Sequence, residues 1–278
     1  MAEATHPELG RRIDVRGIGT NVHVLGDPGG QPTVLFLHGS GPGASAYSNW
    51  RLTMPAVADR RCVVAPDLLG FGWTDRPAGI AYDLPTWTAH VVGVLDTLGI
   101  AQADVVANSF GGSLALALAI HHPERVRRIV LVNATGAPMP LTEGLDKVWG
   151  YTPSIEAMEE LLGLFAYDTS LVSPDLARLR YEASIRPGVQ ESFAQMFPAP
   201  RQQALDAITH DPDDISRIPH PTLLVHGRED RVIPMSSSLT LLALIPHAQL
   251  HVFGECGHWT QIEHAEAVTG LIRDFLTD

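Results

Sequence analysis

The order of hydrophobic and polar residues divides the chain into short apolar runs and longer stretches with helical spacing. Short, nearly continuous apolar runs are typical of parallel strands in a sheet that is covered on both faces. The chain contains six such runs, at residues 33–37, 62–65, 105–107, 129–132, 222–226 and 250–253. We therefore expect a mostly parallel sheet.

Helical stretches lie between these runs and carry start and stop signals. Residues 84–98 keep one face apolar, with Pro85 in the first turn and Gly99 after the last. Residues 113–120 are apolar on all sides, as expected of a helix buried in the middle of a fold. Residues 268–276 have the apolar spacing of a surface helix packed on a sheet. The alternation of strands with helices predicts the α/β class.

The stretch from residue 137 to residue 207 interrupts this alternation. It is rich in proline, and its apolar residues have helical rather than strand spacing. We predict a helical cap at 137–207, inserted into an α/β core made of residues 1–136 and 208–278. Open α/β sheets bind ligands outside the carboxyl ends of their strands, so a cap over this edge would cover a binding site.

Charge and cysteine content narrow the possible partners. The net charge of −12 argues against nucleic acid and anionic membranes, because both repel an acidic surface. An acidic protein that binds an anionic small molecule needs a local cationic pocket, so individual arginines are candidate ligand contacts. Cys62 and Cys256 are too few for a disulfide framework. With no signal-peptide pattern and no apolar run long enough for a bilayer, we expect a cytoplasmic protein.

The strongest local signal is the segment 105–112, Val-Val-Ala-Asn-Ser-Phe-Gly-Gly. A predicted strand ends here, Ser109 follows it, and two glycines precede the apolar helix. This is the strand–turn–helix context of a nucleophile elbow, in which a sharp turn raises the serine hydroxyl above the sheet. The usual pattern is G-x-S-x-G, and Ala107 stands at its first glycine. The alternative is a serine in an ordinary tight loop, but we predict that Ser109 is the nucleophile.

A serine hydroxyl needs a base that a third group holds in place. Two later segments supply both in the order Ser–Asp–His of the α/β-hydrolases. The first is a strand and loop that end at Asp230, and the second is a strand and glycine-bracketed loop that end at His258. We predict that His258 takes the hydroxyl proton and that Asp230 fixes its tautomer. Glu229 adjoins Asp230 and remains an alternative acid.

Other reactive side chains near these segments receive structural interpretations. Asp67 follows an earlier strand and is expected to stabilise its own turn. His264 lies on the helix after the predicted base and is interpreted as a surface residue. Cys256 has no elbow of its own and is assigned to packing.

A glycine-rich loop at residues 37–43, Leu-His-Gly-Ser-Gly-Pro-Gly, follows the first predicted strand. Such a loop can point backbone N–H groups at a developing oxyanion. We expect donors from Ser40 and from Phe110, the residue after the nucleophile. A phosphate-binding loop is excluded because no G-K-[ST] follows. His38 is expected to brace the loop.

These residues resemble those of the meta-cleavage product hydrolases, which hydrolyse carbon–carbon bonds in bacterial aromatic catabolism. The resemblance covers nearly the whole chain, and its cap portion is similar to the branch that acts on monocyclic, alkyl-substituted products. It is carried by residues 38–43, 108–112, 143–154, 165–168, 179–184 and 257–263. The family implies an α/β-hydrolase fold with an eight-stranded, mostly parallel sheet, flanking helices and a helical cap.

The resemblance also implies the reaction. Water would cleave the C5–C6 bond of a 2-hydroxy-6-oxohexa-2,4-dienoate to give 2-hydroxypenta-2,4-dienoate and a short carboxylic acid, with no metal or cofactor. His258 would carry the proton that ketonises the enol, and the N–H groups of Ser40 and Phe110 would stabilise the oxyanion at C6. Ser109 would then either attack covalently or activate water. The implied partners are a small dienoate and a second copy of the chain, in a homodimer or larger homo-oligomer.

Matching positions in the family assign the substrate contacts. Arg180 would bind the substrate carboxylate, because its planar fork holds two oxygens, and Asn49 and Asn108 would assist it. An arginine on the cap surface is the alternative. The remaining predicted contacts pack the dienoate or border the space for its 6-substituent: Trp259, Phe165, Trp149, Leu145, Thr135 and Ile233.

Two other functions stay open at this point. A carboxylesterase or lactonase would use the same triad on an ester bond. A non-catalytic ligand-binding protein could share the fold, although a complete Ser–Asp–His set disfavours it. Dehalogenases and epoxide hydrolases need an aspartate at position 109 and are excluded.

Overall fold

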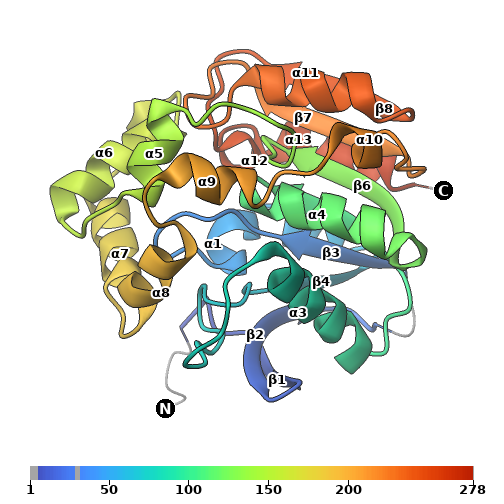
Figure 1. Cartoon of the computed structure of the whole chain (residues 1–278), viewed down its shortest axis with the longest axis horizontal. Helices are drawn as coiled ribbons and strands as arrows, with labels where there is room; N and C mark the ends of the chain where they lie inside the picture. Colours follow the sequence, from blue (N-terminus) through green and yellow to red (C-terminus); the bar gives the residue numbers. More distant parts are fainter. Residues whose placement is uncertain (1–5, 29–31, 278) are drawn as a thin grey trace.

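The computed structural model of the chain describes residues 6–28 and 32–277, and these contain one eight-stranded sheet (Figure 1). The strand order is β1-β2-β4-β3-β5-β6-β7-β8; β1 and β2 are antiparallel to their neighbours, and all other pairs are parallel. The expectation of a mostly parallel sheet is confirmed. The strands are β1 (Arg11–Val15), β2 (Ile18–Leu25), β3 (Thr33–Leu37), β4 (Cys62–Pro66), β5 (Ala103–Asn108), β6 (Val126–Val132), β7 (Thr222–Gly227) and β8 (Ala248–Phe253).

Both faces of the sheet are buried. In β3, Leu35 and Leu37 belong to one hydrophobic cluster, whereas Val34 and Phe36 belong to another. Successive side chains of a strand point to opposite faces, so the two clusters are the two sides of the sheet. This double burial explains why the central strands are nearly continuous apolar runs in the sequence.

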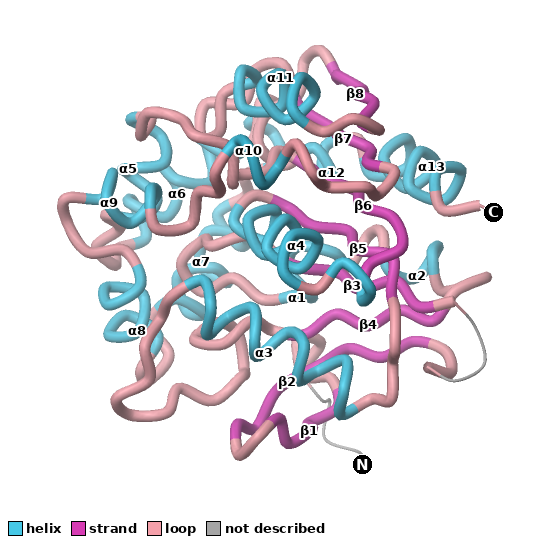
Figure 2. Tube along the Cα trace, turned by 45° about the vertical axis from the view of Figure 1, so that its right-hand side comes forward, coloured by secondary structure: helices cyan, strands magenta, loops and turns pink. Residues whose placement is uncertain are grey.

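Helices cover the two faces, as Figure 2 shows. Apolar side chains of α3 (Leu84–Thr97), α4 (Phe110–His121), α10 (Pro212–Ile215) and α11 (Met235–Leu244) enter the first cluster. Those of α1 (Ala46–Trp50), α2 (Met54–Val57) and α13 (Ala265–Phe275) enter the second. The short elements η1 (Pro123–Arg125) and α12 (Thr260–Glu263) precede β6 and α13. Among the described residues, no helix combines the length and the apolar character needed to cross a membrane.

A group of helices connects β6 to β7 and gathers at one end of the molecule (Figure 1). Its elements are α5 (Glu143–Trp149), α6 (Ile155–Phe165), η2 (Thr169–Leu171), α7 (Pro174–Ser184), α8 (Val189–Met196) and α9 (Arg201–Asp206). Thr142, Ser154 and Ser173 cap the first residues of α5, α6 and α7 with their hydroxyls. These helices lie within the predicted insertion at 137–207; the division into domains stays a prediction.

The β1–β2 hairpin was not among the strands expected from the sequence. Its two-residue turn consists of Arg16 and Gly17, both with positive φ, which suits the twist of a tight hairpin. Charged side chains at Arg11, Arg12 and Asp14 are exposed at this edge of the sheet. Because the hairpin buries few side chains, its sequence lacks the apolar run that marks the central strands.

Two fully or nearly buried histidines make the fold sensitive to acid. Burial lowers the pKa of His38 to about 4 and that of His90 to about 4. The unfolded chain therefore binds these protons first as the pH falls below 6.5, and stability falls from there toward pH 4. Each histidine lowers the free energy of unfolding by up to about 3 kcal/mol over this range. Burial raises the pKa of Asp67 to about 6, so the folded protein binds this proton first, which offsets part of the loss.

We expect the urea concentration at the midpoint of unfolding to fall steadily between pH 6.5 and pH 4. His90→Gln should show a weaker pH dependence than the unmodified protein, because its side chain does not titrate. A midpoint that stays constant over this range would contradict the prediction.

Candidate active site

The turn between β5 and α4 holds Ser109 in an unusual backbone conformation. Its φ is 52° and its ψ is −121°, a region that residues with a side chain rarely adopt. Such strain amounts to about 1–3 kcal/mol and persists only where the surroundings enforce it. The N–H of Ser109 donates to the carbonyl of Val132 at 3.0 Å. The turn thus has the sharp geometry expected of a nucleophile elbow.

The two glycines after Ser109 let the helix approach the sheet. A Cβ atom on Gly111 would lie 2.7 Å from the carbonyl oxygen of Leu37. One on Gly112 would lie 2.4 Å from the Cβ of Ala134. Both distances are too short for real contacts, so larger residues would push α4 away from β3 and the loop after β6.

His258 and Asp230 meet at the same edge of the sheet, after β8 and β7. The Nδ1 atom of His258 lies 2.8 Å from Oδ2 of Asp230. The other oxygen, Oδ1, accepts from the backbone N–H groups of Val232 and Ile233 at 2.7 and 2.9 Å. The carboxylate is therefore fixed by its own loop and can hold the imidazole in one orientation.

Asn133 is a further partner of Asp230 that was not identified from the sequence. It follows β6 with a φ of 48°, and its Nδ2 donates to Oδ2 of Asp230 at 2.6 Å. Thr260 in turn donates to Oδ1 of Asn133 at 2.6 Å. Burial favours a higher pKa for Asp230, but His258, His226 and Asn133 outweigh it and lower the pKa. The sequence signal that could have identified Asn133 is its position as a polar residue directly after a central strand.

The alternative acid, Glu229, makes different contacts. Its Oε2 accepts from the N–H of Cys256 at 3.0 Å, and its Oε1 pairs with Nε of Arg228 at 2.8 Å. The thiol of Cys256 is buried, and burial raises its pKa to about 12, so it stays protonated. The ring of His264 stacks on Phe253. Of the two neighbouring acids, only Asp230 contacts His258.

Asp67 ties together three segments of the core. Its Oδ1 accepts from the N–H of Ala46, and its Oδ2 accepts from the N–H of Trp73 and the amide of Asn21. The carboxyl group is fully buried. These contacts agree with the expectation that Asp67 holds its own turn in place.

The glycine-rich loop after β3 presents Ser40 beside the elbow. Within the described part of the chain, neither the N–H of Ser40 nor that of Phe110 has a hydrogen-bond partner. Phe110 is the first residue of α4, whose N-terminal end carries a partial positive charge. Both N–H groups are therefore free to donate to an oxyanion.

Two buried side chains support this loop. His38 donates from Nδ1 to the carbonyl of Gly39, and its Nε2 accepts from the N–H of Leu68. Behind Ser40, the indole N–H of Trp149 donates to the Ser40 hydroxyl at 2.9 Å. His38 thus braces the loop as expected, and Trp149 contributes to the same support.

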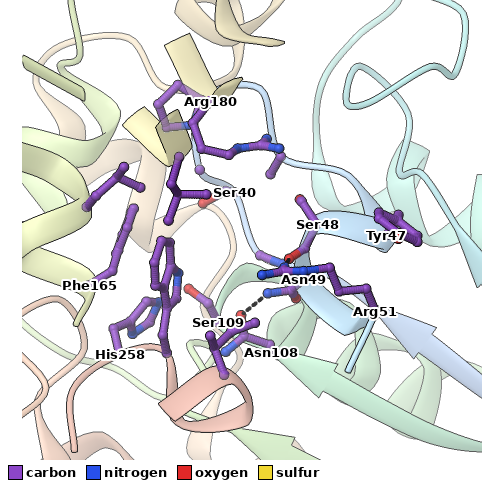
Figure 3. Close-up of a pocket in the computed structure, with 18 of the residues that line it drawn as sticks. Ser40, Tyr47, Ser48, Asn49, Arg51, Asn108, Ser109, Phe165, Arg180 and His258 are labelled. Carbon is purple, nitrogen blue, oxygen red and sulfur yellow. Dashed lines mark hydrogen bonds between the residues drawn. The ribbon is translucent and has the colours of Figure 1, made fainter. Parts of the chain in front are cut away.

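A cavity of about 470 Å³ opens beside Ser109 and His258. Figure 3 shows Phe165 and His258 on one side of it and Asn49 and Arg51 on the other. Its apolar lining comes mainly from the cap helices and the loops after β7 and β8: Leu145, Val148, Met158, Leu162, Phe165, Val232, Trp259 and Ile262. Its polar lining includes Glu8, Ser40, Ser48, Asn49, Arg51, Asn108 and Arg180. No three His, Cys, Asp or Glu side chains of the described residues are grouped so that they could hold a metal ion.

Phe165 connects the cap to the loop that carries the base. Its carbonyl accepts from the N–H of His258 at 2.7 Å and from that of Trp259 at 3.1 Å. Its ring stacks on Trp259 with a centroid distance of 5.3 Å. The cap therefore fixes the position of His258 through the backbone as well as covering it.

Asn49 and Asn108 form one hydrogen-bonded wall of the cavity. The amide of Asn49 donates to Oδ1 of Asn108 at 3.1 Å and accepts from the N–H of Gly39 at 3.3 Å. The amide of Asn108 donates to the carbonyl of Val132 at 3.0 Å. The two asparagines are thus held in fixed orientations beside Ser109.

Arg180 borders the cavity but already has an anionic partner. Its Nη1 lies 2.8 Å from Oε1 of Glu8, and its Nη2 donates to the carbonyl of Gly43. Both residues of the ion pair are buried. Arg180 thus lines the cavity, and its role in substrate binding stays a prediction; Glu8 was not among the residues expected there.

Several predicted residues do not border the cavity. Trp149 was expected to line it but stacks on Phe197 at 4.3 Å, behind Ser40. Thr135 bonds with the hydroxyl of Ser113, and Ile233 packs in the core. Asp230 and the ring of Phe110 also lie outside the lining. This fits their predicted roles, because Asp230 would act through His258 and Phe110 only through its backbone N–H.

Three comparisons relate the chain to known proteins. The family model described as alpha/beta hydrolase fold matches residues 32–265. The chain is 56% identical over 277 residues to a 2-hydroxymuconate semialdehyde hydrolase of Pseudomonas sp. strain CF600, covering 100% of this chain and 97% of the relative. It is 54% identical to a 2-hydroxy-6-oxo-2,4-heptadienoate hydrolase of Pseudomonas putida F1, covering 97% and 96%.

The structural comparison agrees. A meta-cleavage product hydrolase from Pseudomonas fluorescens IP01, CumD, was solved as a serine-to-alanine mutant complexed with acetates. It superimposes on the chain with a TM-score of 0.94 at 54% identity, covering 97% of this chain and 98% of that one.

Proposed function

Because the chain belongs to the α/β-hydrolase family and, within it, to the meta-cleavage product hydrolases, we propose that it hydrolyses the C5–C6 bond of 2-hydroxy-6-oxohexa-2,4-dienoates with hydrogen or an alkyl group at C6. The observation that carries the proposal is a cavity with Ser109 and His258 at its wall, polar on one side and apolar on the other. The names of the similar hydrolases support the substrate class.

The first step is ketonisation of the substrate. The 2-hydroxyl proton moves to C5, which converts the conjugated enol into a 2,6-diketone. His258 is the proton carrier, because it borders the cavity and Asp230 orients it. The ketone at C2 then accepts the electron pair that C5 receives in the next step.

The second step breaks the carbon–carbon bond. An oxygen nucleophile adds to the C6 carbonyl, and the N–H groups of Ser40 and Phe110 stabilise the oxyanion. The C5–C6 bond breaks, its electron pair passes to the 2-oxygen through the C3–C4 double bond, and 2-hydroxypenta-2,4-dienoate leaves. If Ser109 is the nucleophile, its hydroxyl proton passes to His258, C6 becomes an ester of Ser109, and water hydrolyses this ester to the carboxylic acid and free serine. If Ser109 instead activates water, C6 becomes the carboxylic acid directly. In both routes the 2-oxygen of the leaving dienolate takes up a proton.

The substrate lies across the cavity in one orientation. In this orientation its carboxylate and 2-oxygen face the asparagine wall and the arginine side of the cavity, and the dienoate packs against Phe165 and Trp259, which line the cavity. The 6-substituent points into the apolar part beneath α5 and α6. Acetate, which the related CumD mutant binds, is the acid that a 6-methyl substrate would release.

The test uses the yellow products of catechol and 3-methylcatechol ring fission. We expect the purified protein to bleach both and to release 2-hydroxypenta-2,4-dienoate with formate or acetate, identified by chromatography. Failure to bleach any 6-hydrogen or 6-alkyl dienoate would refute the proposal. Faster hydrolysis of p-nitrophenyl acetate than of either dienoate would favour the esterase alternative, and absence of turnover in both assays would favour a binding protein.

Assembly and location complete the proposal. We infer a homodimer, which the family resemblance supports and which light scattering of the purified protein tests. We also infer a cytoplasmic location, which the two free, buried cysteines support. Fractionation of the source cells tests it.

A further inference from the structure

The charge of Arg180 is compensated within the protein. Glu8 pairs with its Nη1, and the carbonyl of Gly43 accepts from its Nη2. A ligand carboxylate that used this guanidinium would have to share it with a buried carboxylate. Like charges at close range repel in a poorly hydrated site, so the Glu8–Arg180 pair by itself attracts an anion weakly.

Arg51 borders the same cavity. It directly follows α1, two residues after Asn49, and its Nη1 donates to the carbonyl of Ser48 at 2.6 Å. No carboxylate of the described residues forms an ion pair with it. Burial lowers the pKa of Arg51, and the positive charge of Arg180 lowers it further, while Tyr47 and the carboxylate of Glu8 raise it by smaller amounts. The guanidinium is thus partly dehydrated and faces a like charge.

The cavity lining therefore holds one uncompensated positive charge. Among the described residues that line it, the charged side chains other than histidines are the carboxylate of Glu8 and the guanidiniums of Arg51 and Arg180. A ligand with a single carboxylate would balance this charge and relieve the repulsion between the arginines. In Figure 3 the Arg51 side chain extends beside Asn49, on the side of Ser109 away from Phe165.

We propose that Arg51 supplies the positive charge that binds the carboxylate of the substrate, and that Arg180, held by Glu8, serves to position that end. The proposal rests on the proposed function for the identity of the substrate. It assigns a specificity role: Arg51 selects carboxylate-bearing dienoates over neutral esters of similar size. Arginine suits this role because its planar fork can donate two parallel hydrogen bonds to one carboxylate.

The test measures binding independently of turnover. The probe is hexa-2,4-dienoate (sorbate), which has the carboxylate and the diene but no C6 carbonyl, and its neutral amide is the matched ligand. Binding is followed by tryptophan fluorescence, because Trp259 borders the cavity. For Arg51→Gln we expect a Kd for sorbate about 10- to 100-fold higher, the loss of one charge-assisted contact. The Kd for the amide should change less than about twofold.

Controls separate a local effect from net charge and folding. Arg60→Gln makes the same change in net charge at an exposed position outside the cavity and should bind sorbate like the unmodified protein. Arg51→Lys keeps the charge without the fork and should give an intermediate Kd. Adding Glu8→Gln to Arg51→Gln returns one positive charge to the cavity, so part of the sorbate affinity should recover.

Several outcomes would overturn the assignment. These are no sorbate binding by the unmodified protein, an unchanged Kd in Arg51→Gln, an equal loss for sorbate and its amide, or no recovery in the double variant. Failure of the protein to bleach dienoates while Arg51→Gln still loses sorbate would refute the proposed function and leave the carboxylate site intact.

Discussion

Ser109→Ala is expected to lower kcat for dienoate bleaching by at least about 10³-fold. Ser109 and His258 both line the cavity, and we propose that the serine hydroxyl provides or activates the nucleophile there. Among the described residues it forms no hydrogen bond, so its removal should change the free energy of unfolding little. The measurement is stopped-flow absorbance at the wavelength of the dienolate, together with the midpoint of urea unfolding.

Ser113→Ala is the matched control for this variant. Ser113 lies one turn further along α4, and its hydroxyl bonds to Thr135 at 2.8 Å, outside the cavity. We expect kcat near that of the unmodified protein and a stability loss of about 1 kcal/mol. Bleaching by Ser109→Ala at more than a tenth of the original rate would remove Ser109 from the mechanism.

Asp230→Asn is expected to lower kcat by about 10³–10⁴-fold. Oδ2 accepts from both His258 and Asn133, and Oδ1 accepts from two backbone N–H groups. An amide has only one acceptor oxygen, so one of these sets of donors would face an NH₂ group. If the NH₂ group takes the place of Oδ2, His258 loses the partner that fixes its tautomer. If it takes the place of Oδ1, the loop after β7 loses its two backbone hydrogen bonds to this side chain. Steady-state bleaching and the unfolding midpoint measure the two effects.

Glu229→Gln provides the comparison for the neighbouring acid. Glu229 accepts from the N–H of Cys256 and pairs with Arg228, and it does not contact His258. Its kcat should stay within about threefold of the original, which is well under 1 kcal/mol in barrier height. Equal losses in Glu229→Gln and Asp230→Asn would show that the loop, and not the Asp230–His258 contact, is what matters.

The central sheet and the elbow could be predicted because their signals are local. Six strands could be predicted from apolar runs alone. Ser109 could be predicted from a strand end, a serine and two glycines that follow one another in the chain. Glycine is required at Gly111 and Gly112 because backbone and side-chain atoms lie within 3 Å of where a Cβ would be. The hairpin β1–β2 escaped prediction because its exposed edge carries charged side chains instead of an apolar run.

The choice between Glu229 and Asp230 illustrates an intermediate case. Adjacent residues in a strand-to-helix loop point in different directions, and the sequence offers two carboxylates with equal chemistry. The prediction favoured Asp230 because the loop after the predicted strand ends at that residue. The hydrogen bond from His258 to Asp230 depends on how the loops after β7 and β8 approach each other.

What the sequence determined alone is the six parallel strands, the turn that presents Ser109, the chain order of Ser109, Asp230 and His258, and the glycine-rich loop after β3. Each follows from residues that are close together in the chain. The electrostatics of the cavity was decided only by the tertiary structure. Glu8 and Arg180 are 172 positions apart, yet form one buried ion pair. That pair neutralises the arginine predicted to bind the carboxylate, and among the described residues Arg51 forms no ion pair, because the partner of a buried charge is set by packing and not by neighbours in the sequence.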